Sequence, residues 1–169
     1  MLLDKDRYEQ HCHWMQYALQ LAAEAGTAGE IPVGAVLVDA EGQVVGEGNN
    51  RKQRDRDPTA HAEIIAIRAS SRKLADWHFN HLTLYVTLEP CPMCSGAIIQ
   101  GRVGTLVYGA DDPKTGAIRS VLNLPDSPAS NHGLTVIGGV LFDECRQQLQ
   151  RWFRERRNHG EGLPESKPN

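Results

Sequence analysis

Apolar residues along this chain of 169 residues follow a helical period in some stretches and form short runs in others. Spacings of three and four residues predict a helix over residues 11–25, which Gly26 ends. Apolar runs bounded by turn residues predict strands, the first two joined as a hairpin. The expected strands are residues 33–38, 44–48, 82–88, 103–108 and 134–138.

Further helices are expected between and after these strands. They are residues 60–72, 91–100 and 142–157. Thr59 is a suitable N-cap for the first of them. The polar stretch 109–130 is typical of a long functional loop, with one short helix near residues 118–122. A hairpin followed by alternating strands and helices predicts an α/β fold, a three-layer α/β/α sandwich with a mixed sheet of about five strands.

Length and composition predict one domain, residues 1–159, followed by a disordered polar tail, residues 160–169. No run of about 18 apolar residues suggests a membrane span, and the N-terminal residues lack the pattern of a signal segment. Four cysteines, two of them in one motif, are typical of metal chemistry in a reducing compartment. We therefore expect a cytoplasmic protein without membrane association.

Charge is concentrated locally, although the net charge of −3 gives no global sign of nucleic-acid binding. Residues 146–157 hold five arginines and one acid, interleaved with Trp152 and Phe153. Such a segment is typical of an RNA-binding surface, but it also fits a solvated helix whose aromatic side chains join the core. A second basic stretch, residues 51–57, contains two aspartates and is the weaker signal.

Two short motifs carry the candidate chemistry, His61-Ala62-Glu63 and Pro90-Cys91-Pro92-Met93-Cys94. One His and two Cys match a catalytic zinc site, in which three protein ligands leave the fourth position to water. The pKa of water at such an ion falls from about 15.7 to near 7. Glu63 does not share a helix face with His61, so it is suited to move protons. We expect one Zn²⁺ held by His61, Cys91 and Cys94, with Glu63 catalytic.

Other interpretations of these residues remain open. A lone C-x-x-C can be a redox pair, and a lone H-x-E can be an ordinary helix start. A structural zinc site needs a fourth ligand, which Cys12 or Cys145 could supply, although both lie in apolar helical patterns that favour packing. In the first strand, Gly34 and Ala35 are small enough to leave room near a ligand.

Beyond the two motifs, the sequence resembles the cytidine deaminase-like zinc enzymes and, among them, the bacterial tRNA-specific adenosine deaminases. The resemblance covers about residues 11–157. It is carried by IPVGAV (31–36), GNNR (48–51), DPTAHAE (57–63), YVTLEP (85–90), GADDPKTG (109–116) and FRERR (153–157).

The resemblance implies conversion of adenosine to inosine at the wobble position of a tRNA anticodon loop, by a homodimer with one Zn²⁺ per subunit. By matching position, Asn50 would hydrogen-bond the flipped base, Val33 would pack on it, and Asp112 would lie near its sugar. Phe153 and Arg154 would contact neighbouring nucleotides, as amide and aromatic side chains do in single-stranded loops. The family thus favours RNA as the partner of the basic C-terminal segment.

Two positions depart from the family pattern. Asn49 stands where many relatives have Trp, which could reshape packing behind the pocket. Asp111 stands where many have Arg, which places a negative charge beside an RNA path.

Two other functions remain open at this point. A small-molecule deaminase acting on guanine, cytosine or a nucleoside shares the zinc centre but needs no basic RNA surface. A zinc-stabilised RNA-binding module would need four protein ligands and would leave no position for water.

Overall fold

The computed structural model describes residues 4–158, which contain one mixed sheet in the order β2-β1-β3-β4-β5. The strands are β1 (Gly34–Val38), β2 (Val44–Asn49), β3 (Thr83–Leu88), β4 (Thr105–Ala110) and β5 (Thr135–Gly138). β1 pairs antiparallel with β2 and β3, whereas β4 pairs parallel with β3 and β5. Every predicted strand is present, with its ends shifted by at most two residues.

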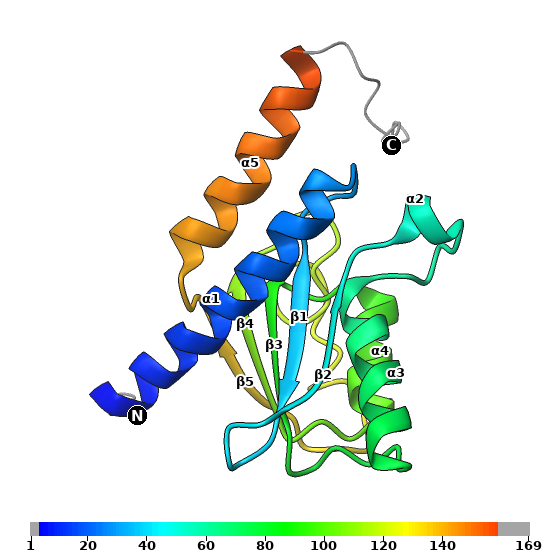
Figure 1. Ribbon diagram of the computed structural model, residues 1–169. Coiled ribbons are helices and arrows are strands. Elements are labelled where there is room, and N and C mark those ends of the chain that lie inside the picture. The colour runs from blue at the N-terminus through cyan, green and yellow to red at the C-terminus, as the bar shows by residue number, and fades with distance from the viewer. Residues whose placement is uncertain (1–3, 159–169) are drawn as a thin grey trace.

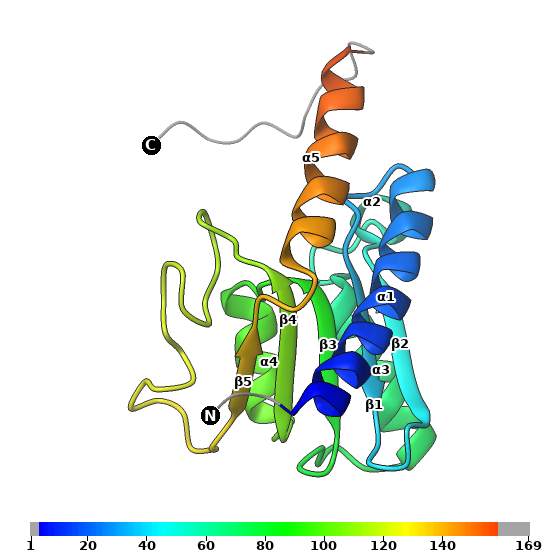
Figure 2. The same ribbon diagram turned by 90° about the vertical axis from the view of Figure 1, so that its left-hand side faces the viewer.

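Helices cover both faces of the sheet. α1 (Lys5–Thr27) and α5 (Phe142–Asn158) lie on one face, and α3 (Ala62–Leu74) and α4 (Pro92–Gln100) lie on the other (Figures 1 and 2). This is the three-layer α/β/α sandwich that the sequence predicts. Within residues 4–158, no helix has the length and apolar character to cross a membrane. The predicted tail, residues 160–169, lies outside the described residues.

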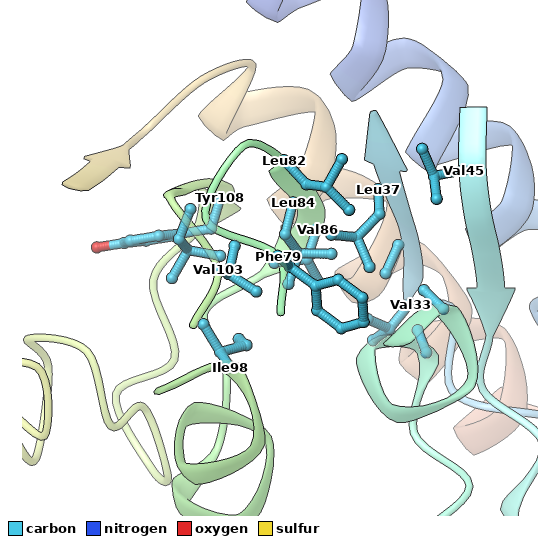
Figure 3. Close-up of a cluster of buried hydrophobic side chains, with 14 of the residues drawn as sticks. Val33, Leu37, Val45, Phe79, Leu82, Leu84, Val86, Ile98, Val103 and Tyr108 are labelled. Carbon is cyan, nitrogen blue, oxygen red and sulfur yellow. The ribbon is translucent and has the colours of Figure 1, made fainter. Parts of the chain in front are cut away.

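Two apolar clusters lie on opposite sides of the sheet. The cluster facing α3 and α4 surrounds the Phe79 ring (Figure 3), and the other contains Trp14 and Met15 of α1. Successive residues of a strand point to opposite faces, so Leu37 joins the first cluster and Val36 the second. β1 is therefore buried on both faces, which explains its continuous apolar sequence.

Glycines of β1 and β2 allow close helix packing. A Cβ on Gly34 would collide with the Ala18 carbonyl oxygen of α1 and lie 2.7 Å from the Ala22 nitrogen. On β2, a Cβ on Gly48 would lie 2.6 Å from the Ala62 carbonyl oxygen of α3. The expectation that Gly34 leaves room for a ligand is wrong, because its missing side chain lets α1 approach the sheet.

The helices differ from expectation where exposure hides the apolar pattern. α1 begins at Lys5 rather than at residue 11, because its first residues are exposed and carry no apolar stripe. α2 (Lys52–Asp55) was not predicted, since its single turn buries no residue. α3 begins at Ala62, because His61 before it is extended. The short helix expected near residues 118–122 is absent, and residues 117–120 form turns instead.

Candidate metal centre

His61 and Cys91 are the N-cap residues of α3 and α4. An N-cap side chain usually accepts a hydrogen bond from the first turn of its own helix, but neither of these does. Both instead meet between the two helix starts, where Cys94 in the first turn of α4 joins them. Pro92 occupies the first helical position of α4, where an N–H group needs no partner.

The three side chains have the spacing of a zinc site. The Sγ atoms of Cys91 and Cys94 each lie 3.6 Å from Nδ1 of His61, and the three ligand atoms lie within 4.8 Å of one another. A tetrahedral zinc ion with Zn–S bonds of about 2.3 Å and Zn–N bonds of about 2.0 Å needs sulfur and nitrogen about 3.5 Å apart. The donor set therefore fits one zinc ion, and among residues 4–158 no fourth side chain joins it, which leaves one tetrahedral position for water.

The other two cysteines take part in packing. Cys145 is buried in the cluster that faces α1, and its sulfur has room only because Gly109 lacks a Cβ. Burial raises the pKa of Cys145 to about 12, so it remains a thiol. Cys12 packs against the same cluster. Within residues 4–158 the metal-ligand group contains neither, which argues against a closed four-ligand zinc site.

The two ligand cysteines do not ionise alike in the metal-free site. Hydrogen bonds from Cys94 and from His61 lower the pKa of Cys91 to about 4. The hydrogen bond to Cys91, together with burial, raises the pKa of Cys94. A divalent cation between the sulfurs would favour both thiolates, so this pair is suited to bind a metal.

Glu63 lies in the first turn of α3 and is only 4% exposed. Burial raises the pKa of its carboxyl group to about 7, and the negative charge of Cys91 adds to this rise. A bound cation would act in the opposite direction by favouring the carboxylate. A buried carboxyl group that titrates near neutral pH can both take up and release a proton.

Asn50 holds the start of α3 in place. Its Oδ1 accepts a hydrogen bond from the Ala62 N–H (3.1 Å), and its Nδ2 donates to the Ile31 carbonyl oxygen (3.0 Å). The Asn50 backbone N–H donates to the Val33 carbonyl oxygen (3.1 Å). The structure thus places Asn50 and Val33 together, next to the helix start that carries His61. An amide has two N–H donors, and Ile31 takes one of them.

Asp112 lies next to residues 90–94, which carry the two ligand cysteines. Its backbone N–H donates to the buried carboxylate of Glu89 (3.0 Å). Its own carboxylate accepts hydrogen bonds from the N–H groups of Lys114 (2.9 Å) and Thr115 (3.2 Å) and from the Thr115 hydroxyl. Asp112 is therefore held in a tight turn. Glu89 was not predicted as part of the site, although an acid directly before the cysteine motif is a signal.

The two departures from the family pattern have partners within the chain. Asp111 accepts hydrogen bonds from Nη2 (2.9 Å) and Nε (3.2 Å) of Arg119, so its negative charge is paired. Asn49 donates from Nδ2 to the Leu21 carbonyl oxygen of α1 (3.0 Å) and accepts from Arg54 (3.1 Å). It therefore joins β2 to α1.

Phe153 and Arg154 lie on α5 and do not line the cavity next to Asn50. Phe153 is half-buried and packs edge-on against Trp152, with ring centroids 5.1 Å apart, while Arg154 is exposed. Trp152 and Arg156 do line that cavity, whose volume is about 310 Å³. Both were missed as site neighbours, although four-residue spacing places them on one face of α5.

Trp152 and Arg156 fasten α5 to the end of α1. The Trp152 indole N–H donates to the Gly26 carbonyl oxygen (3.3 Å), and Arg156 donates to the Gly29 carbonyl oxygen (3.1 Å). The Arg156 guanidinium lies over the Trp152 ring, 4.4 Å from its centroid. The basic segment is thus a helix whose inner face packs and whose outer face carries exposed arginines.

The fold and the three-ligand site define a zinc-dependent deaminase, and the chain belongs to the cytidine and deoxycytidylate deaminase family, whose zinc-binding region matches residues 8–110. Its relatives include proteins named tRNA-specific adenosine deaminase. The protein from Haemophilus influenzae is 52% identical, over 85% of this chain and 83% of that protein. The protein from Bacillus subtilis is 41% identical, over 85% of this chain and 89% of its own length.

Solved structures agree with this assignment. One, from a study of A-to-I editing by tRNA:A34 deaminases at the wobble position of transfer RNA, matches with a TM-score of 0.78 and 41% identity, covering 80% of this chain and 98% of that one. A guanine deaminase from Nitrosomonas europaea matches with a TM-score of 0.70 and 28% identity, covering 82% and 81%.

Proposed function

We propose that this protein deaminates adenosine to inosine at the wobble position of the tRNA anticodon loop. It acts in the cytoplasm as a homodimer with one zinc ion per subunit, and residues 1–159 form a single deaminase domain. The observation that carries the proposal is the three-ligand centre with the buried Glu63 beside it. Relatives that are 52% and 41% identical and named tRNA-specific adenosine deaminase support RNA as the substrate.

The reaction is a hydrolysis in which Glu63 moves protons. His61, Cys91 and Cys94 would hold the zinc ion, which would supply an activated water for attack on the ring carbon that carries the amino group. Glu63 takes one proton from the water and delivers it to the adjacent ring nitrogen. It then takes the second proton from the oxygen that has bonded to the ring carbon and passes it to the departing amine, so that a C=O bond replaces the broken C–N bond. Water is consumed, ammonia leaves, and the carboxyl group returns to its starting form.

The remaining predicted site residues orient the RNA. Asn50 is held by two hydrogen bonds within the protein, so its second amide N–H has a fixed direction for the base. Val33, 5% exposed, packs on the flipped base. Asp112 lies near the sugar, while Phe153 and Arg154 contact neighbouring anticodon nucleotides.

Mass analysis of an anticodon stem-loop with a wobble adenosine tests this function directly. Zinc-loaded protein should form inosine at that position and nowhere else in the loop. Glu63→Ala should keep its zinc, because Glu63 is not among the ligand atoms, and should lose about 10²- to 10⁴-fold in rate. A Glu63→Ala protein that retains both zinc and full activity would overturn the role of Glu63.

Two further measurements test the other parts of the proposal. Free guanine, cytosine and nucleosides are incubated with the same protein, and turnover of these compounds without product on RNA would establish the small-molecule alternative. Light scattering of the zinc-loaded protein should give twice the mass of one chain, and a monomer would contradict the homodimer.

A further inference from the structure

Glu89 is a buried carboxylate between the metal-ligand segment, residues 90–94, and the loop formed by residues 111–120. It directly follows β3, precedes Pro90 and Cys91, and is 2% exposed. Charged side chains are rarely buried this fully unless several groups bind them. The partners of Glu89 therefore indicate what it does.

Both carboxylate oxygens of Glu89 accept hydrogen bonds from residues of the loop. Oε1 accepts hydrogen bonds from the backbone N–H groups of Ile118 (3.1 Å), Arg119 (2.8 Å) and Ser120 (2.9 Å). Oε2 accepts from the backbone N–H of Asp112 (3.0 Å) and from the Ser120 hydroxyl. A single side chain thus joins the start of the loop to its end.

Further contacts wrap the loop around this carboxylate. The Ala117 N–H donates to the Pro90 carbonyl oxygen (2.9 Å), and the Glu89 N–H donates to the Ala110 carbonyl oxygen (2.8 Å). A Cβ on Gly116 would lie 2.5 Å from Cδ of Glu89, so only glycine fits at the top of the loop. The loop is therefore hydrogen-bonded to both residues that precede Cys91, Glu89 and Pro90.

These bonds favour the charged form of Glu89. Five hydrogen-bond donors converge on its two buried carboxylate oxygens, and hydrogen bonds of this kind stabilise a carboxylate more than a neutral carboxyl group. Hydrogen bonds to an ionised acceptor are stronger than neutral ones. The loop is consequently fixed to the metal-ligand segment by charge-assisted bonds.

We propose that Glu89 is a positioning residue for RNA binding. It holds the loop of residues 111–120, which carries Asp112 and Arg119, in a fixed position relative to the metal-ligand segment. Glu89 acts through the loop and touches neither the metal ligands nor the substrate. The proposal rests on the proposed function, in which Asp112 lies near the sugar of the substrate. Loss of the Glu89 carboxylate should weaken RNA binding more than it slows the chemical step.

Glu89→Gln tests this with little change in size. The variant turns one acceptor oxygen into an N–H donor that faces other donors. In the zinc-loaded, full-length protein we expect zinc content to be unchanged, KM for the anticodon stem-loop to rise about tenfold, as for one lost hydrogen bond to a charged group, and kcat to stay within about threefold. Unchanged kinetic constants, or loss of zinc, would overturn the proposal.

A double-mutant cycle with Asp112→Ala separates positioning from general destabilisation. If Glu89 acts through the loop, Glu89→Gln should raise KM by less than about threefold once Asp112 has been removed. An equal effect in both backgrounds contradicts the mechanism. Val36→Ala, which weakens the core on the other face of the sheet, is the matched control and should lower the thermal midpoint without raising KM.

Limited trypsin digestion gives a readout that does not depend on deaminase activity. Lys114 and Arg119 are exposed cleavage sites within the loop. Cleavage there should be faster in Glu89→Gln than in the parent or in Val36→Ala, and equal rates would refute the loop anchor. If the parent protein forms no inosine, the proposed function fails, but the digestion rates still show whether Glu89 anchors the loop. Should Glu89→Gln not fold, Ser120→Ala, which removes one donor, should give a smaller change of the same kind.

Discussion

The amide of Asn50 stabilises the fold and, in the proposed function, also binds the base, and a matched pair of substitutions separates these roles. Asn50→Asp replaces the Nδ2 donor with an oxygen that faces the Ile31 carbonyl oxygen. Two facing acceptors repel, so the free energy of unfolding should fall by about 1–3 kcal/mol, and loss of the base donor should raise KM for the stem-loop. Denaturant unfolding and steady-state kinetics measure the two effects.

Asn49→Asp is the control, because Asn49 donates an equivalent bond to the Leu21 carbonyl oxygen without adjoining the metal centre. It should lose somewhat less stability, because Arg54 donates to the other oxygen of this side chain, and it should keep its KM. If both variants lose RNA binding equally, Asn50 acts only through the fold.

The ion pair between Asp111 and Arg119 lowers the positive charge on the loop. The pair is half-exposed, so it contributes at most about 1 kcal/mol to stability and can be removed without unfolding the protein. Asp111→Arg adds a positive charge and releases Arg119 for phosphate. Affinity for tRNA should rise at low salt, and the slope of log K against log [salt] should steepen by about one.

Asp143→Arg provides the same change of charge at a distant exposed pair, with Arg146 on α5. Its salt slope should change less. Equal slopes for the two variants would mean that only the total charge of the protein matters.

At the scale of elements, the position of α3 decides the position of His61 and Glu63. A Cβ at Gly48 of β2 would lie 2.6 Å from the Ala62 carbonyl oxygen and 2.8 Å from the Ala66 nitrogen, so Gly48→Ala must push the start of α3 away. Overpacking of this kind costs about 1–3 kcal/mol. Thermal unfolding and a chelator titration should show lower stability and weaker zinc retention.

Gly133→Ala is the matched control, because no atom lies within 4 Å of its Cβ position. It should leave both measurements unchanged. A Gly48→Ala protein with normal zinc retention would show that α3 can shift without moving His61 from its partners.

The elements also show which features the sequence could predict. β1 was predictable because burial on both faces requires an unbroken apolar run, and the metal motifs were predictable because ligand chemistry restricts residue types. α2 was not, since a helix of one exposed turn has no apolar face. The anchoring of the loop by Glu89 was also hidden, because four of its five donors are backbone N–H groups, which every residue but proline carries.

At the scale of the whole molecule, the metal joins helices from different parts of the sequence. His61 is the N-cap of α3 and Cys91 is the N-cap of α4, and both helices lie on the same face of the sheet. A ligand bound only by the folded state stabilises that state, so zinc removal should lower the thermal midpoint, and added zinc should restore it. An unchanged midpoint after verified metal removal would show that the two helix starts are held by packing alone.

The metal-free protein should also reveal the unequal ionisation of its cysteines. The pKa of Cys91 is lowered to about 4 by hydrogen bonds from Cys94 and His61, so Cys91 is a thiolate throughout the range from about pH 5 to pH 8. Its alkylation rate, followed by peptide mass analysis, should therefore be nearly flat over that range. Cys145, whose pKa is raised to about 12 by burial, should remain unmodified under the same conditions.

Zinc should protect Cys91, because the metal occupies the sulfur lone pair that attacks the reagent. A rate for Cys91 that rises tenfold with each pH unit would mean that it is an ordinary thiol before the metal binds, and that zinc itself must displace the proton.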